Sequence, residues 1–323
     1  MNLEIIWFTI IAALLAGFIF LEGFDFGVGI LQFFLGKHES ERRTYIYSIS
    51  SHWDANEVWL LAAVGATFAV FPIWYATLFS ALYLPLTLLL LALIVRGVCF
   101  EFRHRASTKT VRTVYDVALM ASSSLAAFII GVVMANLAAG IPINKNGIFT
   151  GSVLDLASPV ALLAGALCLS LFLSNGALFL TLKIEGELQE RACKFSRLLI
   201  LISLLLFLLM TLVVLIYCPF CLIALLFISA SAFFVFRRSF NYAFISLGLC
   251  SVCSVAILFY AMFPNVLIST VAENSLTVWN TASPEYTLRI MSMAAAISAP
   301  VILACQIWSY YVFRKRINPI NAR

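Results

Sequence analysis

Long apolar stretches separated by short polar segments dominate the pattern of this chain. A helix needs about 20 predominantly apolar residues to cross the hydrocarbon core of a bilayer, and nine stretches approach or exceed that length. They cover residues 3–35, 54–76, 78–100, 113–138, 158–182, 196–217, 219–236, 242–264 and 287–313. The first exceeds one crossing, and the seventh is short. The pattern predicts an all-α polytopic membrane protein with nine transmembrane helices.

The order of these stretches predicts two consecutive four-helix bundles followed by one peripheral helix. The first bundle would occupy residues 1–138 and the second residues 158–264. The polar segments 139–157 and 265–286 would be loops on one side of the membrane, each too short to fold alone. The ninth helix and a basic tail would occupy residues 287–323. No soluble domain is expected.

Composition and charge placement agree with a membrane location. Of the 323 residues, 63% are hydrophobic and 11% are charged, whereas about a quarter of the residues of a soluble protein are charged. If the N-terminus is outside, all of the 20 Lys and Arg residues except Lys145 and Arg289 fall in inner segments. Cytoplasmic loops are enriched in Lys and Arg, so we expect an outer N-terminus and a cytoplasmic C-terminus. The formal charge of +5 then needs no nucleic acid partner.

The N-terminal stretch MNLEIIWFTI has no basic region before its apolar residues and no small-residue cleavage site. We therefore expect a retained span here and not a signal peptide.

Five carboxylates lie within or beside the predicted spans, where an ionisable group is costly. They are Glu22 and Asp25 in LEGFDFGVG, Asp54 and Glu57 in SHWDANEVW, and Glu101 in RGVCFEFRHR. The predicted topology brings all five to the cytoplasmic end of the first bundle. Partly buried carboxylates linked by water can take up and release protons. The grouping therefore predicts a proton pathway from the cytoplasm through Asp54, Glu101 and Asp25.

Simpler interpretations exist for the two outermost acids. Asp54 could cap the second span, because Asp is a favoured N-cap and is stabilised by the helix dipole. Glu101 could be an interfacial acid paired with Arg103 or Arg105.

Asp25 is harder to explain as a structural residue, because it lies well inside an apolar span. If the first and third spans meet, Arg96 is its most obvious partner, whereas Glu22 and Glu57 are expected to be structural. Trp53 and Trp59 lie beside the same turn, where interfacial anchoring is the ordinary role of tryptophan. Small residues that permit close helix approach flank Asp25, namely Gly23, Gly27 and Gly29.

Eight cysteines include two C-x-x-C pairs, at 218–221 and 250–253. A shared zinc or iron–sulfur site is not expected, because Cys253 would lie roughly 16 Å below the outer end of its span at about 1.5 Å per residue. Four ligands must converge within a few ångströms. We expect no metal site, and interpret the cysteines as buried apolar residues. A redox pair of Cys218 and Cys221 at the outer turn is the alternative.

The three histidines, His38, His52 and His104, all fall in or beside predicted inner loops. A transmembrane haem needs axial His or Met ligands that face the interior of a bundle. No predicted span contains an intramembrane His to pair with its methionines, so we expect no haem or other cofactor to be bound by this chain alone.

Four motifs in order resemble subunit II of cytochrome bd-type quinol oxidases. They are GFDFGVG (23–29), HWD-x-N-x-VW (52–59), RGVCFEFR (96–103) and SLTVWNTAS (275–283). The resemblance extends over the whole chain, including the nine spans and the outer N-terminus.

The resemblance implies a haem-free subunit in the bacterial cytoplasmic (inner) membrane. Its partner would be the haem-bearing subunit I, with two b-type haems, haem d and the quinol-oxidising loop, in a pseudo-symmetric heterodimer. Small single-helix accessory subunits, membrane lipids and a structural quinone or lipid are further expected partners. The complex would oxidise quinol, reduce dioxygen to water and generate a proton motive force without pumping, because its chemical protons come from the cytoplasm.

By motif match, Asp54 and Glu101 correspond to the proton-conducting acids of the family. Trp59 corresponds to a tryptophan near a hydrophobic oxygen route, and Asp25 to an acid that is either structural or proton-relaying. Supporting roles are implied for Arg96, Trp53, Trp59 and Asn56. The chain departs from the pattern at Glu57 and Asn280, where the family has Gln and Asp, which puts a role for these two in doubt.

Two other functions are consistent with the acids alone. A proton-coupled secondary transporter would have broken helices at mid-membrane, and Pro85 and Pro300 are expected to interrupt their spans. A purely structural scaffold subunit would tolerate replacement of every acid.

Overall fold

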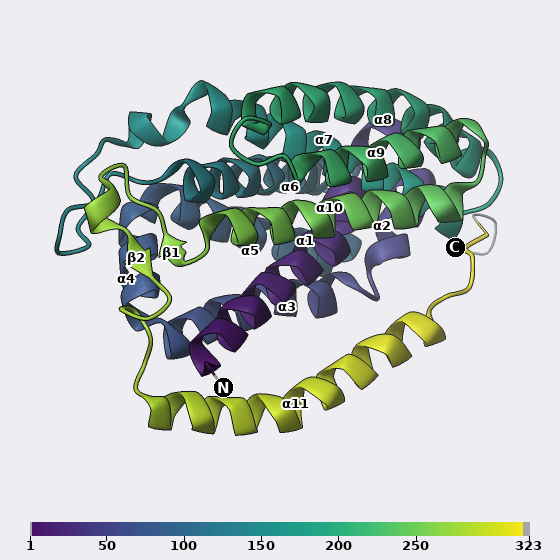
Figure 1. Cartoon of the computed structure of the whole chain (residues 1–323). Coiled ribbons are helices and arrows are strands. Elements are labelled where there is room, and N and C mark those ends of the chain that lie inside the picture. Colours follow the sequence, from purple (N-terminus) through teal and green to yellow (C-terminus); the bar gives the residue numbers. More distant parts are fainter. Residues whose placement is uncertain (1, 319–323) are drawn as a thin grey trace.

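A computed structural model describes residues 2–318 of the chain, and its secondary structure is almost entirely helical. Figure 1 shows long helices packed side by side, with α11 set apart from the others. The helices are α1 (Leu3–Leu35), α2 (Glu39–Ile49), α3 (Trp53–Val70), α4 (Pro72–Ala81), α5 (Tyr83–Phe102), α6 (Lys109–Ala139), α7 (Pro159–Lys183), α8 (Glu187–Val214), α9 (Cys221–Phe236), α10 (Phe240–Met262) and α11 (Glu285–Val312).

Seven helices are long and apolar enough to cross a membrane: α1, α5, α6, α7, α8, α10 and α11. The shorter α9 is also apolar, and α3 has 18 residues. The all-α membrane fold that the sequence predicts is therefore confirmed. The count of nine spans, the orientation of the termini and the division into two bundles stay predictions. α1 does not keep to the first predicted bundle: it contacts α7 and α10 as well as α3 and α6.

The second predicted span is wrong in its boundaries. The sequence predicts helices over residues 54–76 and 78–100, but α3 ends at Val70, the short α4 follows, and α5 begins only at Tyr83, so the start of the third predicted span belongs to α4. Pro72 is the cause, because proline cannot donate to the preceding turn and disfavours helical geometry in the residue before it. Phe71 accordingly leaves the helix with φ −128° and ψ 66°, and Pro72 becomes the first residue of α4.

Pro85 and Pro300 were expected to interrupt their spans, and the outcomes differ: the predicted span 78–100 is interrupted at Leu82, three residues before Pro85, whereas α11 is continuous. Pro85 lies in the first turn of α5, where its missing N–H costs nothing, and Pro300 lies inside α11, which continues through it. Neither helix is broken.

Glycines let α1 and α7 approach closely, as the sequence predicts for Gly23, Gly27 and Gly29. A Cβ at Gly27 would lie 2.0 Å from the backbone oxygen of Phe172 and 2.9 Å from Cα of Gly176. A Cβ at Gly29 would meet Ser123 of α6. α1 is thus packed between helices that come from both halves of the chain.

The two predicted loops, 139–157 and 265–286, fold against each other and not separately. The second contains β1 (Asn265–Leu267) and β2 (Leu276–Thr277), which pair antiparallel. Ile141 donates to Ile268 at 2.9 Å, and the Asn274 amide donates to the carbonyl of Ile143 at 2.9 Å. Figure 1 shows this region at the opposite end of the molecule from α2 and the C-terminus.

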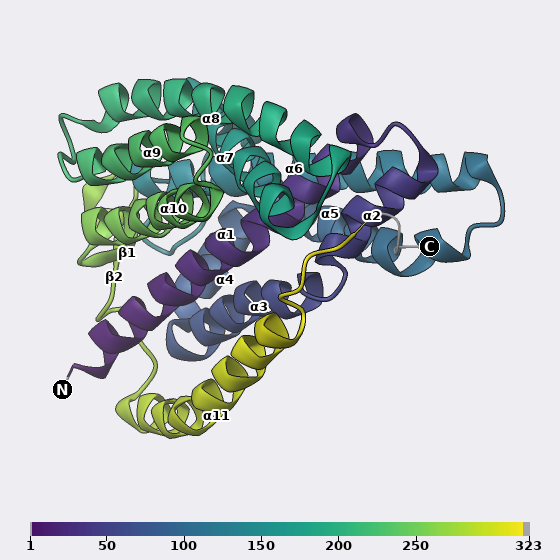
Figure 2. The ribbon, with the colours of Figure 1, turned by 90° about the vertical axis from the view of Figure 1, so that its right-hand side faces the viewer.

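α11 is peripheral, as predicted. Leu288 is its one buried residue within the described part of the chain, and Figure 2 shows the helix at the edge of the molecule, with α3 beside it.

Candidate functional site

A fully buried arginine lies close to acids from two other helices. Arg96 of α5 forms an ion pair with the buried Glu22 of α1, and its Nη1 lies 3.8 Å from Oε2 of Glu57 on α3. Its guanidinium also lies 4.4 Å from the ring centroid of Phe26. The first and third spans therefore do meet, but the expected pairing of Arg96 with Asp25 is wrong. Glu22, one helical turn away from Asp25, takes that place.

Asp25 is bound instead by an amide. Nδ2 of Asn56 donates to Oδ2 of Asp25 at 2.7 Å, and both residues are fully buried. Oδ1 of Asn56 accepts from Nε2 of Gln306 and from the hydroxyl of Tyr310, each at 2.9 Å. Asn56 thus connects the acid on α1 to the inner part of α11. We call Glu22, Asp25, Asn56, Glu57 and Arg96 the Arg96 cluster.

Asp54 lies on the exposed surface beside this cluster. It is the second residue of α3, and His52 occupies the N-cap without a side-chain hydrogen bond. The expectation that Asp54 caps the helix is therefore wrong, although its place in the first turn suits the helix dipole. Its charge acts on Glu22 and Glu57, so the three carboxylates form one electrostatic group.

Glu101 is also exposed, at the end of α5. Within the described residues it forms no ion pair, so the expected pairing with Arg103 or Arg105 is wrong. The ring of Trp53, at the start of α3, lies 5.1 Å from that of Phe100. This contact joins the helix ends that carry Asp54 and Glu101, the two acids that the sequence assigns to the start of the pathway.

Trp59, which belongs to α3, packs against a different part of α1. A Cβ at Gly17 would lie 2.3 Å from the Trp59 ring, so the indole occupies the space that the glycine leaves. A cavity of about 100 Å³ lies between α1, α3, α4, α5 and α6, lined by Leu60, Phe18 and other apolar side chains. An oxygen route near Trp59 stays a prediction.

A second polar network, which the sequence reasoning missed, ties the helix ends together. The carboxylate of Asp116 on α6 accepts from Arg42 and from Arg103, each with one contact at 3.2 Å, and Arg103 also binds Glu39 at 3.0 Å. The buried amide of Gln32 donates to the backbone oxygen of Asp116 at 2.9 Å. Two signals were available: Asp116 is an acid inside the fourth apolar stretch, and Gln32 is a polar residue inside the first.

Gln306 and Tyr310 were also missed. Gln306 is a polar side chain in the last apolar stretch, but Tyr310 resembles an ordinary interfacial aromatic residue. Their contact with Asn56 depends on how α11 lies against α3, which the local sequence does not encode.

His52 is buried between aromatic rings at the start of α3. Its ring stacks on Tyr310 with centroids 4.5 Å apart and meets Phe313 edge-on at 5.9 Å. Burial, reinforced by the charge of Lys183, lowers the pKa of His52 from 6.5 to about 4. The imidazole is therefore neutral at physiological pH and acts as a flat apolar surface.

The depressed pKa makes stability depend on pH. Between pH 6.5 and 4 the unfolded chain binds a proton at His52 that the folded chain does not, so stability is fully present near pH 7 and falls as the pH drops. His52→Phe keeps the stacking ring and should remove about 2 kcal/mol of acid destabilisation at pH 5. Thermal unfolding of the purified protein at pH 7.5 and 5 measures this difference. His104→Phe, at an exposed histidine, is the control and should lose as much stability between pH 7.5 and 5 as the wild type does. If His52→Phe loses as much stability as His104→Phe, the role of His52 in the acid sensitivity is contradicted.

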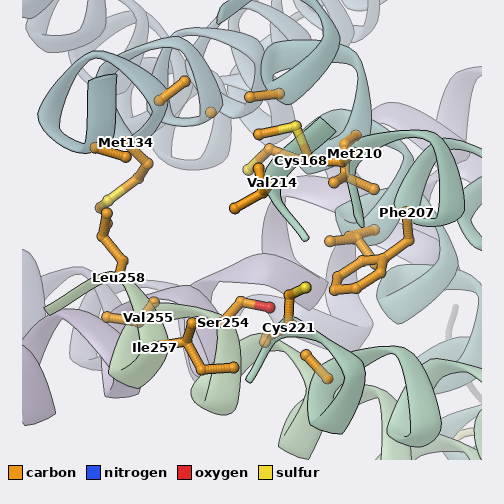
Figure 3. Close-up of a pocket in the computed structure, with 18 of the residues that line it drawn as sticks. Met134, Cys168, Phe207, Met210, Val214, Cys221, Ser254, Val255, Ile257 and Leu258 are labelled. Carbon is orange, nitrogen blue, oxygen red and sulfur yellow. The ribbon is translucent and has the colours of Figure 1, made fainter. Parts of the chain in front are cut away.

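An apolar cavity of about 250 Å³ lies between α6, α7, α8, α9 and α10 (Figure 3). Its lining includes Cys168, Cys218 and Cys221, together with Thr211, whose buried hydroxyl has no hydrogen-bond partner among the described residues. Cys250 is instead buried in the apolar core that α8, α9 and α10 share. The described cysteines are all free thiols, and the second C-x-x-C pair does not line this cavity.

The cavities of about 100 and 250 Å³, both within residues 2–318, do not offer axial histidine ligands for a haem. Neither cavity is lined by a histidine, and the larger one falls below the ~300–1,000 Å³ of pockets for drug-sized ligands. The His52 ring is already covered by Tyr310 and Phe313. Within residues 2–318, no group of three or more His, Cys, Asp or Glu side chains converges as metal ligands do.

Comparison with known proteins places the whole chain in one family. Residues 3–313 match the family described as "Cytochrome bd terminal oxidase subunit II". The chain is 37% identical over 329 residues to "Cytochrome bd ubiquinol oxidase subunit 2" of Bacillus subtilis (strain 168), covering 98% of this chain and 97% of that protein. It is 31% identical over 363 residues to "Cytochrome bd-I ubiquinol oxidase subunit 2" of Escherichia coli (strain K12), covering 98% and 95%.

The fold is also similar to a solved structure. The bd oxidase from Geobacillus thermodenitrificans contains a chain that superposes with a TM-score of 0.76 at 21% identity, covering 97% of each chain. The apolar helices, the acid motifs and these similarities lead to one conclusion: the chain belongs to the cytochrome bd terminal oxidase subunit II family, and is a multi-span membrane subunit of an oxidoreductase complex.

Proposed function

We propose that this chain is the haem-free subunit of a quinol:dioxygen oxidoreductase and conducts cytoplasmic protons to its partner. The partner is subunit I, which supplies two b-type haems and haem d, the site of dioxygen reduction. The names of the relatives from Bacillus subtilis and Escherichia coli support a quinol as reductant. The complex would generate a proton motive force without pumping, because the protons consumed in water formation come from the cytoplasmic side.

The observation that carries the proposal is a gradient of exposure along linked acids. Asp54 is exposed, the side chain of Glu57 is 20% exposed, and Glu22 and Asp25 are fully buried. Oδ1 of Asp25 has no hydrogen-bond partner among the described residues. A buried carboxylate oxygen without a partner is costly, and a proton or a bridging water relieves that cost. The acids can therefore pass protons inward from the surface, with Arg96 compensating the negative charge.

The charges support the orientation that this role requires. The end that carries Asp54 and Glu101 also carries Arg42, Arg103 and Arg191. Basic residues mark the cytoplasmic side, so the N-terminus would be outside and the acids would open to the cytoplasm.

The positions of the exposed acids also support a location for subunit I on this chain. Asp54 and Glu101 share the surface of α3 and α5 with exposed apolar residues such as Leu61 and Val98. A carboxylate facing lipid is costly, whereas one facing a protein partner can pass its proton on. We therefore place subunit I against α3 and α5. Accessory subunits and a structural quinone or lipid stay predictions.

Neutralising the exposed acids tests the proposal. In the assembled complex, Asp54→Asn and Glu101→Gln should each lower quinol-dependent oxygen uptake at least tenfold, because an amide cannot relay a proton. Glu190→Gln, an exposed acid at the same end on α8, is the matched control and should retain full turnover. Wild-type turnover in both acid variants would remove the proton pathway and favour the scaffold function.

The helix breaks at Phe71 and Leu82 do not favour the transporter alternative, because they lie at the opposite ends of α3 and α5 from Asp54 and Glu101. A transporter needs broken helices at mid-membrane, whereas α5 and α11 continue past Pro85 and Pro300.

A further inference from the structure

The middle of α11 makes almost no contact with the rest of the chain. Every side chain from residue 296 to residue 305 is exposed, and Figure 1 shows the helix set apart from the others. Near its outer end, Trp7 donates to the hydroxyl of Ser292 at 3.0 Å. Near its inner end, Gln306 and Tyr310 bind Asn56. Packing along its length therefore does not hold α11 in register with α3.

The segment after α11 provides an anchor. Ile317 exchanges backbone hydrogen bonds of 2.8 and 3.2 Å with the residues on either side of Ile184. Arg316 donates to the last-turn carbonyls of α7, at 3.0 Å to Leu182 and 3.2 Å to Thr181. The last carbonyls of a helix lack partners within the helix and attract cations. We call residues 313–317 the tail clasp, because they fasten the inner end of α11 to α7.

The fastened end of α11 sets the orientation of the Asn56 amide. Gln306 and Tyr310 both donate to Oδ1, so Nδ2 points the other way, toward Asp25 at 2.7 Å and toward the carbonyl of Leu21 at 3.4 Å. Without the two donors, only Asp25 and the Leu21 carbonyl hold the amide, and the Asn56 side chain is free to shift. The hydrogen bond on Asp25 is then weakened, although neither Gln306 nor Tyr310 donates to that acid.

We propose that Gln306, Tyr310 and the tail clasp form a positioning device that holds Asn56 as a donor to Asp25. The device rests on the proposed proton pathway for its effect on turnover, but its geometry can be tested independently. α11 and the C-terminal tail then contribute to proton transfer, although none of the acids lies on them: the acids lie on α1, α3 and α5.

The hydrogen bonds are tested by Tyr310→Phe combined with Gln306→Leu in the assembled oxidase. Tyr310→Phe keeps the ring stacked on His52 and removes only the hydroxyl. We expect kcat to fall about tenfold, as the loss of a hydrogen bond to a charged group allows, with the KM for quinol unchanged. The ratio of kcat in H₂O to kcat in D₂O should rise, because proton transfer becomes slower relative to the other steps.

Tyr311→Phe is the matched control, because Tyr311 is exposed and its hydroxyl makes no hydrogen bond within residues 2–318. It should leave kcat and the isotope ratio unchanged. An unchanged visible haem spectrum confirms assembly, and Tyr310→Phe alone replaces the double variant if that fails to assemble. Wild-type kcat and isotope ratio in the assembled variant would overturn the positioning role.

The tail clasp is tested by Arg316→Ala, with Arg316→Lys as the conservative variant. Amide hydrogen exchange in the assembled complex should become at least threefold faster over residues 306–312 in Arg316→Ala and recover in Arg316→Lys. Unchanged exchange would overturn the clasp. If Asp25→Asn leaves turnover unchanged, the proton pathway fails, while the exchange result still decides whether the clasp holds α11.

Discussion

Replacing Gly27 with alanine is expected to prevent stable assembly of this subunit. The added Cβ would lie 2.0 Å from a backbone oxygen of α7 and 2.9 Å from Cα of Gly176. Both obstacles are backbone atoms, so no side chain can move aside, and α1 and α7 must separate. Overpacking of a core costs about 1–3 kcal/mol and sometimes more, and here it acts on the central helix of the fold. The yield of complex in membranes and its thermal midpoint measure the loss.

Gly65→Ala is the matched control. A Cβ at Gly65 of α3 meets nothing within 4 Å, and alanine in a helix is favoured over glycine by about 0.5–1 kcal/mol. Because Gly65 is exposed on α3, the surface that we assign to subunit I, the thermal midpoint of the subunit and not the yield of complex is compared, and it should not fall. A Gly27→Ala complex with a normal yield and thermal midpoint would contradict the close crossing of α1 and α7.

Removing Arg96 is expected to have the second largest effect. Arg96→Leu leaves the buried carboxylate of Glu22 without its counter-charge, and breaking a buried pair in this way costs about 3–5 kcal/mol. The lost free energy should appear as a lower thermal midpoint and a lower yield of complex. Arg105→Leu removes an exposed arginine from the same end of α5 and should be neutral.

A second substitution separates the charge from the packing. Glu22→Gln together with Arg96→Met removes both charges and should restore much of the stability, because replacing both partners of a buried pair can be neutral. Failure of this double variant to recover, or normal stability of Arg96→Leu, would contradict the ion pair.

The membrane fold could be predicted from the sequence because a span is a local property of about 20 residues. The boundaries of α1, α6 and α7 follow the apolar stretches closely. The break before α4 was missed because Pro72 lies within an apolar stretch, where hydropathy outweighs a single helix-breaking residue. The pairing of the two loops was missed because backbone hydrogen bonds between distant segments leave no local pattern.

The acids of the candidate site were found because charge inside an apolar stretch is conspicuous, and Arg96 and Asn56 were named beside them, but which acid each of these two contacts was not predicted. Glu22 and Asp25 lie three residues apart on α1, so both can face the third span. Which of them meets Arg96 depends on the rotation and crossing of α1 and α5. Asn56, Gln306 and Tyr310 are uncharged, so depth alone did not single out the network that α11 completes.

The central claim is that acids at the cytoplasmic end of this subunit supply the protons for dioxygen reduction. It is tested most directly by following proton uptake from the medium, with a pH-indicator dye, after dioxygen is mixed with the fully reduced complex. We expect Asp54→Asn with Glu101→Gln to take up protons at least tenfold more slowly than the wild type, while dioxygen still binds at the normal rate. Proton uptake at the wild-type rate in this double variant would contradict the account.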